Sequence, residues 1–260
     1  MKDALVITKR QLLQLLRVPE VLIFSTIQPV MFVLLFRYVF GGAINTPGVD
    51  YVQLLMPGIF VQTVAFTVAS TALGLAEDMQ KGLIDRFRSL PISRSAVVVG
   101  RTLGDATLNI VVLVVMAIAG YIVGWRPSSP LSEILAGFLF LLIFGYAMSW
   151  MGVLVGLSVR DSRVANSAVF LFVFPMTFLS NAFAPTTGMP RPLQYVAEWN
   201  PVSTMVAGVR DLFGLKPMFG ATANSFPSQH PLTMSLIYIG LLMLIFIPLS
   251  VRKYKNVTPK

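Results

Sequence analysis

Six long apolar stretches, separated by polar or charged segments, dominate this chain. They cover residues 21–40, 52–76, 102–125, 133–159, 165–183 and 232–251. An α-helix rises 1.5 Å per residue, so about 20 residues cross the hydrocarbon core of a bilayer. The pattern therefore predicts an all-α membrane protein with six transmembrane helices in a single domain, residues 1–260.

Three segments outside these stretches have patterns of their own. In residues 1–18, four cations lie beside leucines at helical spacing. This pattern favours an amphipathic helix in the membrane interface. The alternative is an ordinary basic flank before a membrane-spanning helix. Residues 184–231 hold apolar patches too short to cross a bilayer. They predict short extracytoplasmic helices that lie at, or partly enter, the membrane surface. Residues 77–101 form the most charged segment of the chain.

Small residues recur four positions apart inside the apolar stretches. Gly152 and Gly156 are one such pair, and Ser70 and Gly74 are another. Small residues at this spacing let two helix backbones approach closely, so they predict tight helix–helix contacts. Asp105 and Asn109 are polar positions near one end of an apolar stretch and are expected to face protein or lipid headgroups.

The composition supports a membrane location and suggests an orientation. Charged residues make up 12% of the chain, against about 25% in soluble proteins. Of the 20 Lys and Arg residues, most fall in segments that share the side of the N-terminus. By the positive-inside rule, both termini and residues 77–101 are cytoplasmic in a multi-pass membrane protein. The net charge of +9 then reflects basic cytoplasmic loops. We expect membrane lipids, and not nucleic acid, as partners of these loops.

Chemistry that would supply energy or catalysis is missing from the sequence. There is no phosphate-binding Gly-x-x-x-x-Gly-Lys-Ser/Thr loop, no His-Glu-x-x-His and no cysteine, and the single histidine is His230. The middle of each apolar stretch also lacks the ionisable residues that ion-coupled carriers use. We expect no catalytic residue and no metal site, so this chain is not an enzyme. If it transports a substrate, energy arrives through another chain.

Residues 81–91 have the pattern of a docking helix. Leu83, Phe87 and Leu90 share one helical stripe, polar residues occupy the other side, and Pro91 ends the pattern. Such a helix fits a groove on a partner protein. The alternative is a loop whose apolar residues fold back onto the membrane, and spacing alone leaves both open.

The chain resembles an ABC-2 type permease, the membrane subunit of an ABC exporter, and most of all the daunorubicin-resistance type. The resemblance covers nearly the whole chain and rests on the basic N-terminal segment, the six apolar stretches, the Lys-Gly-Leu-Ile-Asp-Arg-Phe-Arg-Ser-Leu-Pro sequence at 81–91, and Asn-Pro-Val-Ser at 200–203 followed by Arg210. It implies that 81–91 is a coupling helix held in a cleft of an ATP-binding subunit. The implied coupling residues are Lys81, Leu83, Ile84, Asp85, Phe87, Arg88, Leu90 and Pro91.

The resemblance also implies an assembly and a substrate path. Two permeases, expected as a homodimer, combine with two ATP-binding subunits; ATP and Mg²⁺ bind those subunits, and this chain binds no cofactor. The path runs between the permeases beside the first, second and fifth spans, which makes candidates of Gln28, Gln62, Thr63, Thr67 and Asn181. Helix–helix hydrogen bonding is the alternative role for each.

The implied activity is ATP-driven export of a hydrophobic or amphipathic drug or lipid. Polysaccharide- or glycolipid-exporting permeases share the plan and remain an alternative. A stand-alone carrier or channel and a non-transporting scaffold are the rivals from other classes.

Overall fold

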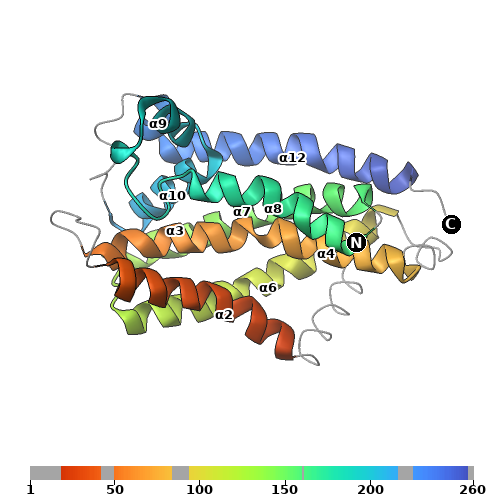
Figure 1. Ribbon diagram of the computed structural model, residues 1–260, viewed down its shortest axis with the longest axis horizontal. Coiled ribbons are helices and arrows are strands. Elements are labelled where there is room, and N and C mark those ends of the chain that lie inside the picture. Colours follow the sequence, from red (N-terminus) through yellow and green to blue (C-terminus); the bar gives the residue numbers. More distant parts are fainter. Residues whose placement is uncertain (1–18, 42–49, 84–93, 160, 216–224, 257–260) are drawn as a thin grey trace.

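The computed structural model describes residues 19–41, 50–83, 94–159, 161–215 and 225–256. These residues form an elongated bundle in which the long helices run roughly side by side (Figure 1). No strand occurs among them, which confirms the all-α prediction.

The helices follow the apolar stretches closely. Their bounds are α2 Pro19–Leu35 with a π-helical continuation η1 Phe36–Phe40, α3 Tyr51–Ala65, α4 Thr67–Gln80, α6 Arg94–Val123, α7 Leu131–Ser158, α8 Ser162–Phe178, a 3₁₀ turn η2 Thr186–Gly188, α9 Arg191–Glu198, α10 Pro201–Leu212, α11 Phe226–Gln229 and α12 Pro231–Asn256.

Four of these helical segments have both the length and the hydropathy to cross a membrane. They are Tyr51–Gln80, which joins α3 and α4, and Val97–Val123, Leu131–Ser158 and Pro231–Tyr254. Two further apolar helices, Ser25–Val39 and Ser162–Phe178, are shorter than that. The structure therefore supports a membrane-spanning bundle, and the count of six spans stays a prediction for α2 and α8.

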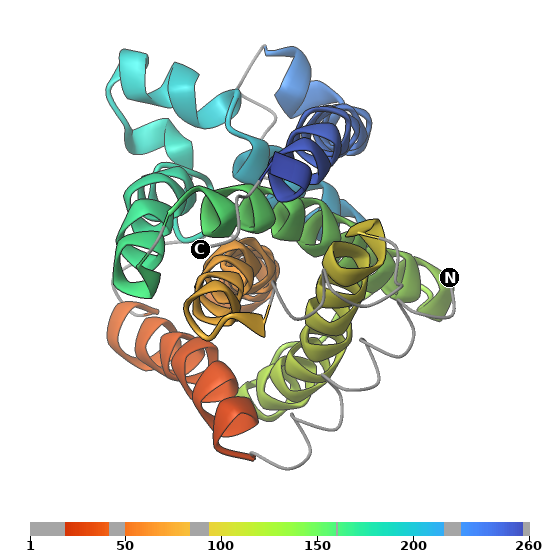
Figure 2. The same ribbon diagram turned by 90° about the vertical axis from the view of Figure 1, so that its right-hand side faces the viewer.

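The helix pair α3–α4 forms the centre of the bundle. Viewed along its length, α3 and α4 lie inside a ring made by α2, α6, α7 and α8 (Figure 2). Nearly every side chain of α3 is buried, including Leu55, Ile59 and Phe60. Gln62 of α3 and Thr67 and Thr71 of α4 are consequently buried among other helices.

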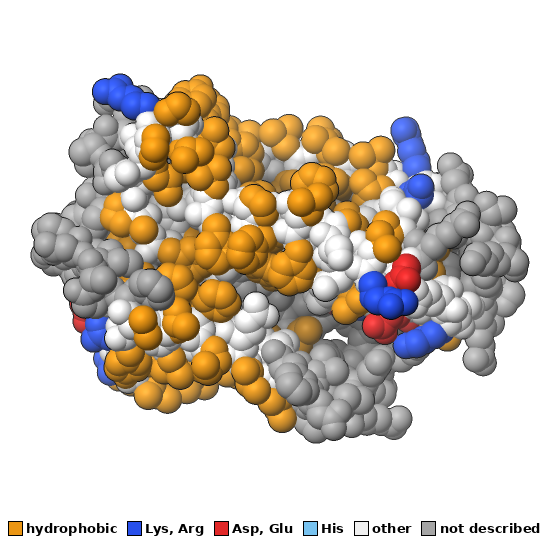
Figure 3. Space-filling model, in the orientation of Figure 1, with side chains coloured by type: hydrophobic (Ala, Val, Ile, Leu, Met, Phe, Trp, Pro, Cys, Tyr) orange, Lys and Arg blue, Asp and Glu red, His pale blue; other side chains and the backbone are white. Residues whose placement is uncertain are grey.

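The outer surface is apolar around the middle of the bundle. Figure 3 shows hydrophobic side chains over the middle of the visible face, and the described charged side chains near its two ends. Exposed large apolar residues on α6, α8 and α12 belong to this surface, among them Ile118, Leu171 and Leu244. Such a band is what a bilayer would cover.

Glycines allow α4 and α7 to touch. A Cβ on Gly152 would collide with the backbone oxygen of Val68, and a Cβ on Gly156 would collide with that of Ala72. The predicted role of this glycine pair in a close helix contact is confirmed.

The substitution Gly152→Ala is expected to destabilise the bundle by about 1–3 kcal/mol, because α4 and α7 must separate to admit the methyl group. Gly240→Ala is the matched control, since a Cβ at Gly240 in α12 meets no atom within 4 Å. Both changes gain the same helix propensity. Thermal unfolding of the two variants in detergent measures the difference; equal stability would contradict the close contact.

Candidate functional site

The end of the bundle where α4 ends and α6 begins carries the predicted coupling segment. Lys81 follows the last residue of α4, is exposed, and pairs with Glu77 at 3.3 Å. Gly82 has φ +66°, a left-handed conformation that suits glycine at a helix end, and Leu83 is half-buried. The other implied coupling residues, Ile84, Asp85, Phe87, Arg88, Leu90 and Pro91, lie outside the described residues, as does the helix expected in 1–18.

A charged cluster joins the two helices that flank this segment. Arg101 of α6 approaches Asp78 of α4 with Nη1 3.4 Å from Oδ2, and its Nε lies 3.7 Å from Oδ1 of Asp105 one turn further along α6. The hydroxyl of Thr71 on α4 donates to Oδ2 of Asp105 at 2.7 Å. Asp105 is buried, and Arg101 and Asp78 are only partly exposed.

The contact continues one turn deeper into the bundle. Thr67 of α4 and Asn109 of α6 exchange hydrogen bonds of 3.1 and 2.9 Å between buried side chains. Because α4 and α6 run in opposite directions, residues 67, 71 and 78 meet residues 109, 105 and 101 in reverse order. We call this set of six side chains the α4–α6 ladder.

Gly74 makes room for the ladder's arginine. A Cβ at this position would overlap the Arg101 guanidinium, so glycine lets that side chain lie flat against α4. There the guanidinium also donates to the backbone oxygen of Ser70 at 3.5 Å. The ladder therefore fixes α4 to α6 directly beside the ends of the segment that separates them.

The five candidate path residues do not form one cluster of hydrogen bonds. Gln28 is exposed on α2, and Gln62 is buried on α3. Thr63 bonds within its own helix, to the oxygen of Ile59 at 2.7 Å, and Thr67 belongs to the ladder. Asn181 lies at the other end of the bundle, after α8.

The α-helical hydrogen-bond pattern is interrupted at one residue between α3 and α4. Regular α-helix stops at Ala65 and resumes at Thr67, with Phe66 between them. A threonine that bonds back to the carbonyl four residues earlier bends helices, and Thr63 does so just before the junction. Three path candidates, Gln62, Thr63 and Thr67, thus surround a break in the central helix pair.

The opposite end of the bundle is fastened by a buried arginine. Arg210 of α10 donates from Nη2 to the oxygens of Leu54 and Asn181, each at 2.9 Å, and from Nε to Leu54 at 3.2 Å. The Tyr51 hydroxyl donates to the oxygen of Phe183 at 2.9 Å beside it. Burial lowers the pKa of Arg210 to about 9, which leaves it protonated at neutral pH. These bonds tie α10, α3 and the segment after α8 together, and we call them the Arg210 clasp.

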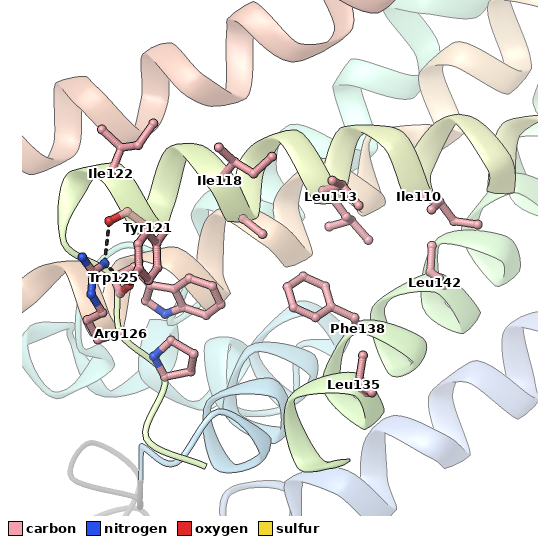
Figure 4. A pocket seen from close by; sticks show the side chains of 13 residues that line it. Ile110, Leu113, Ile118, Tyr121, Ile122, Trp125, Arg126, Leu135, Phe138 and Leu142 are labelled. Carbon is pink, nitrogen blue, oxygen red and sulfur yellow. Dashed lines mark hydrogen bonds between the residues drawn. The ribbon is translucent and has the colours of Figure 1, made fainter. Parts of the chain in front are cut away.

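Two apolar pockets open on the described surface. A pocket of about 690 Å³ lies between α6 and α7, with Trp125 and Arg126 at one end (Figure 4). A second, of about 490 Å³, lies between the end of α8 and α9, against Pro175, Tyr195 and Trp199. Neither of these two includes any of the five path candidates. Among the residues that the structure describes, no group of acidic or histidine side chains is placed to hold a metal.

Comparison with known proteins matches nearly the whole bundle. The family model described as ABC-2 type transporter matches residues 3–213. The daunorubicin resistance ABC transporter permease protein DrrB1 of Streptomyces coeruleorubidus is 31% identical over 238 residues, covering 92% of this chain and 81% of that protein.

More distant relatives carry similar names. A protein named as transport permease ycf38, from Cyanophora paradoxa, is 26% identical over 216 residues, with 82% of this chain and 74% of that protein covered. A protein of Mycobacterium tuberculosis named for doxorubicin resistance as the ABC transporter permease DrrC is 25% identical over 207 residues, covering 75% and 72%.

Proposed function

Because the chain belongs to the ABC-2 type transporter family, we propose that it is the permease subunit of an ATP-driven exporter of a hydrophobic or amphipathic drug or lipid. The observation that carries this proposal is the family match across residues 3–213 together with relatives named as drug-resistance permeases. Relatives named for resistance to daunorubicin and doxorubicin favour a hydrophobic or amphipathic substrate over a polysaccharide.

The arrangement in the membrane follows from the same premise. The chain spans the bacterial inner membrane six times, with α2 and α8 as its two shorter spans and both termini in the cytoplasm. Two copies pair, and the path for the substrate runs between them. Support for this pairing comes from α8, where Phe170, Phe174 and Phe178 are exposed at a spacing of four residues and form one apolar face that a second copy could cover.

Energy enters at the α4–α6 end. Two ATP-binding subunits carry ATP and Mg²⁺, and each holds one coupling segment, residues 81–91, in a cleft. The α4–α6 ladder lies beside both ends of that segment, so a displacement of the segment moves both helices as one body. Because α4 packs against α7 and α8, the motion reaches the helices around it.

Nucleotide binding shifts the permease between two states only through contacts that differ between those states. The irregular turn at Phe66 lies in the central pair, between the coupling end and Gln62. Movement of α4 can therefore reorient Thr63 and Thr67 while the Arg210 clasp holds the far end of α3.

Leu83→Ala combined with Phe87→Ala is expected to reduce coupled transport at least ten-fold, because it removes the apolar stripe that the ATP-binding subunit grips. Copurification of the two subunits and ATP-dependent uptake of daunorubicin into inside-out vesicles measure the effect. Membrane insertion should be unchanged.

The matched control truncates one leucine and one aromatic residue at the opposite end of the bundle. Leu193 and Tyr195 on α9 are both exposed, so Leu193→Ala with Tyr195→Ala should leave copurification intact. Normal copurification and normal uptake in the Leu83/Phe87 variant would rule out this segment as the docking site.

A further inference from the structure

The pocket between α6 and α7 is a groove with apolar walls and an arginine at one end. Ile110 and Leu113 of α6 face Phe138 and Leu142 of α7 along it, as Figure 4 shows. Trp125 and Arg126 lie at the end where α6 stops. Its volume of about 690 Å³ lies within the range of roughly 300–1,000 Å³ typical of ligand pockets.

The charged end of the groove is held in place by neighbouring elements. Trp125 is buried and stacks edge-on against Phe60 at 5.3 Å and Phe213 at 5.2 Å between ring centroids. Gln53 of α3 accepts the backbone N–H of Arg126 and donates to the oxygen of Gly124, both at 3.0 Å. The groove is therefore formed before any ligand arrives.

The Arg126 side chain is oriented but not neutralised. Its Nη1 donates to the oxygens of Tyr121 and Trp125, and its guanidinium carbon lies 3.6 Å from the centre of the Tyr121 ring. Within the described part of the chain, no carboxylate lies within ion-pair distance of Arg126. A guanidinium carries five N–H donors, so Nε and Nη2 are left for an acceptor outside the protein.

The rest of the groove faces the apolar surface of the bundle. Val114, Ile118 and Leu135 line it and are more than half exposed. Acyl chains are the surroundings that a membrane-spanning helix offers such residues, and the outer end of α6 is where a headgroup would lie. An arginine at the level of the headgroups, beside an apolar groove, suits the phosphate of a lipid whose acyl chain lies in that groove.

We propose that this groove binds one anionic glycerophospholipid of the bilayer, with an acyl chain between α6 and α7 and the headgroup phosphate on Nε and Nη2 of Arg126. The proposal rests on the membrane location and not on the substrate or the ATP-binding subunit. The site belongs to a single chain and lies away from the path candidates, so the lipid is a structural ligand and not the exported molecule.

The test uses Trp125 as its reporter. With Trp150→Phe and Trp199→Phe, Trp125 is the remaining tryptophan of the three. This protein is placed in vesicles of phosphatidylcholine that contain either brominated phosphatidylglycerol or brominated phosphatidylcholine. We expect half-maximal quenching of Trp125 at about five-fold lower mole fraction of the anionic lipid, which corresponds to one cation near the membrane surface.

Two substitutions and one control test separately the contact with the lipid headgroup and the contact with the acyl chain in the groove. Arg126→Gln should abolish the preference for phosphatidylglycerol, while Arg191→Gln, on an exposed arginine of α9, should keep it. Val114→Phe, which fills the groove, should lower quenching by both lipids. The Arg126→Gln and Arg191→Gln readouts compare two lipids on the same folded protein, so a loss of general stability does not imitate their result.

Three outcomes would overturn the proposal. Equal quenching by the two lipids, or a preference that survives Arg126→Gln, would show that Arg126 does not select an anionic headgroup. Absence of quenching by either lipid would show that another protein surface, such as a second copy, covers the groove.

Discussion

Arg101→Leu is expected to destabilise the folded permease by about 3 kcal/mol, because it leaves a buried carboxylate without its cation. Asp105 keeps only the hydroxyl of Thr71 in that variant, and Asp78 also loses the guanidinium that approaches it. Coupled transport should fall with stability, since the ladder joins the two helices at the ends of the proposed coupling segment. Urea or heat unfolding in bicelles measures the loss.

A second variant distinguishes the ion pair from simple loss of side-chain packing. In Arg101→Leu with Asp105→Leu both partners become apolar, and such replacements are often neutral, so stability should recover by at least about 1 kcal/mol over the single variant. Arg163→Leu is the control, because its pair with Asp161 is exposed and is expected to contribute less than about 1 kcal/mol. A double variant no more stable than Arg101→Leu would contradict the role given to the ladder.

Arg210→Leu is expected to cost about 2–4 kcal/mol, because charge-assisted hydrogen bonds are lost and buried oxygens are left without a donor. The affected oxygens are those of Leu54, Asn181 and Ala182. Arg210→Lys should restore only part of this, since an ammonium group lacks the planar fork that reaches two segments at once.

Hydrogen exchange locates the effect of Arg210→Leu. Amides of residues 179–184 should exchange faster in this variant, while those of α6 should not. Arg191→Leu is the matched control at the same end of the bundle, because Arg191 is exposed on α9. Unchanged exchange at 179–184 would show that the clasp does not hold this segment.

Helix type could be read from the sequence, but helix ends could not. Hydropathy places the third stretch at 102–125, whereas α6 begins at Arg94 and ends at Val123. The helix continues past the apolar region because its backbone hydrogen bonds do not depend on lipid. The fifth stretch shows the opposite: α8 ends at Phe178, five residues before 183, because the Asn200 side chain donates to the oxygens of Met176 and Leu179 at its end. That contact crosses 24 residues, and local spacing does not reveal it.

The sequence predicted part of the α4–α6 ladder and of the Arg210 clasp. Asp105 and Asn109 were expected to face protein or headgroups, and both face α4. Spacing along the chain indicates no partner for Arg101, and Arg210 enters only through the family resemblance, although its side chain is buried. One signal was available for Arg210: it follows Val206 and Val209 and precedes Phe213, so an apolar face surrounds it. Pairing across α4 and α6 needs three-dimensional contacts and could not be read from either helix alone.

Under the proposed function, this chain moves its substrate only when a separate ATP-binding subunit drives it. The direct measurement reconstitutes the purified permease into liposomes, with and without an ATP-binding subunit obtained by coexpression, and follows a fluorescent amphipathic drug. We predict uptake into inside-out liposomes only when both subunits and ATP·Mg²⁺ are present, and none with a non-hydrolysable nucleotide. Equal uptake by the permease alone would contradict this prediction and identify a stand-alone carrier.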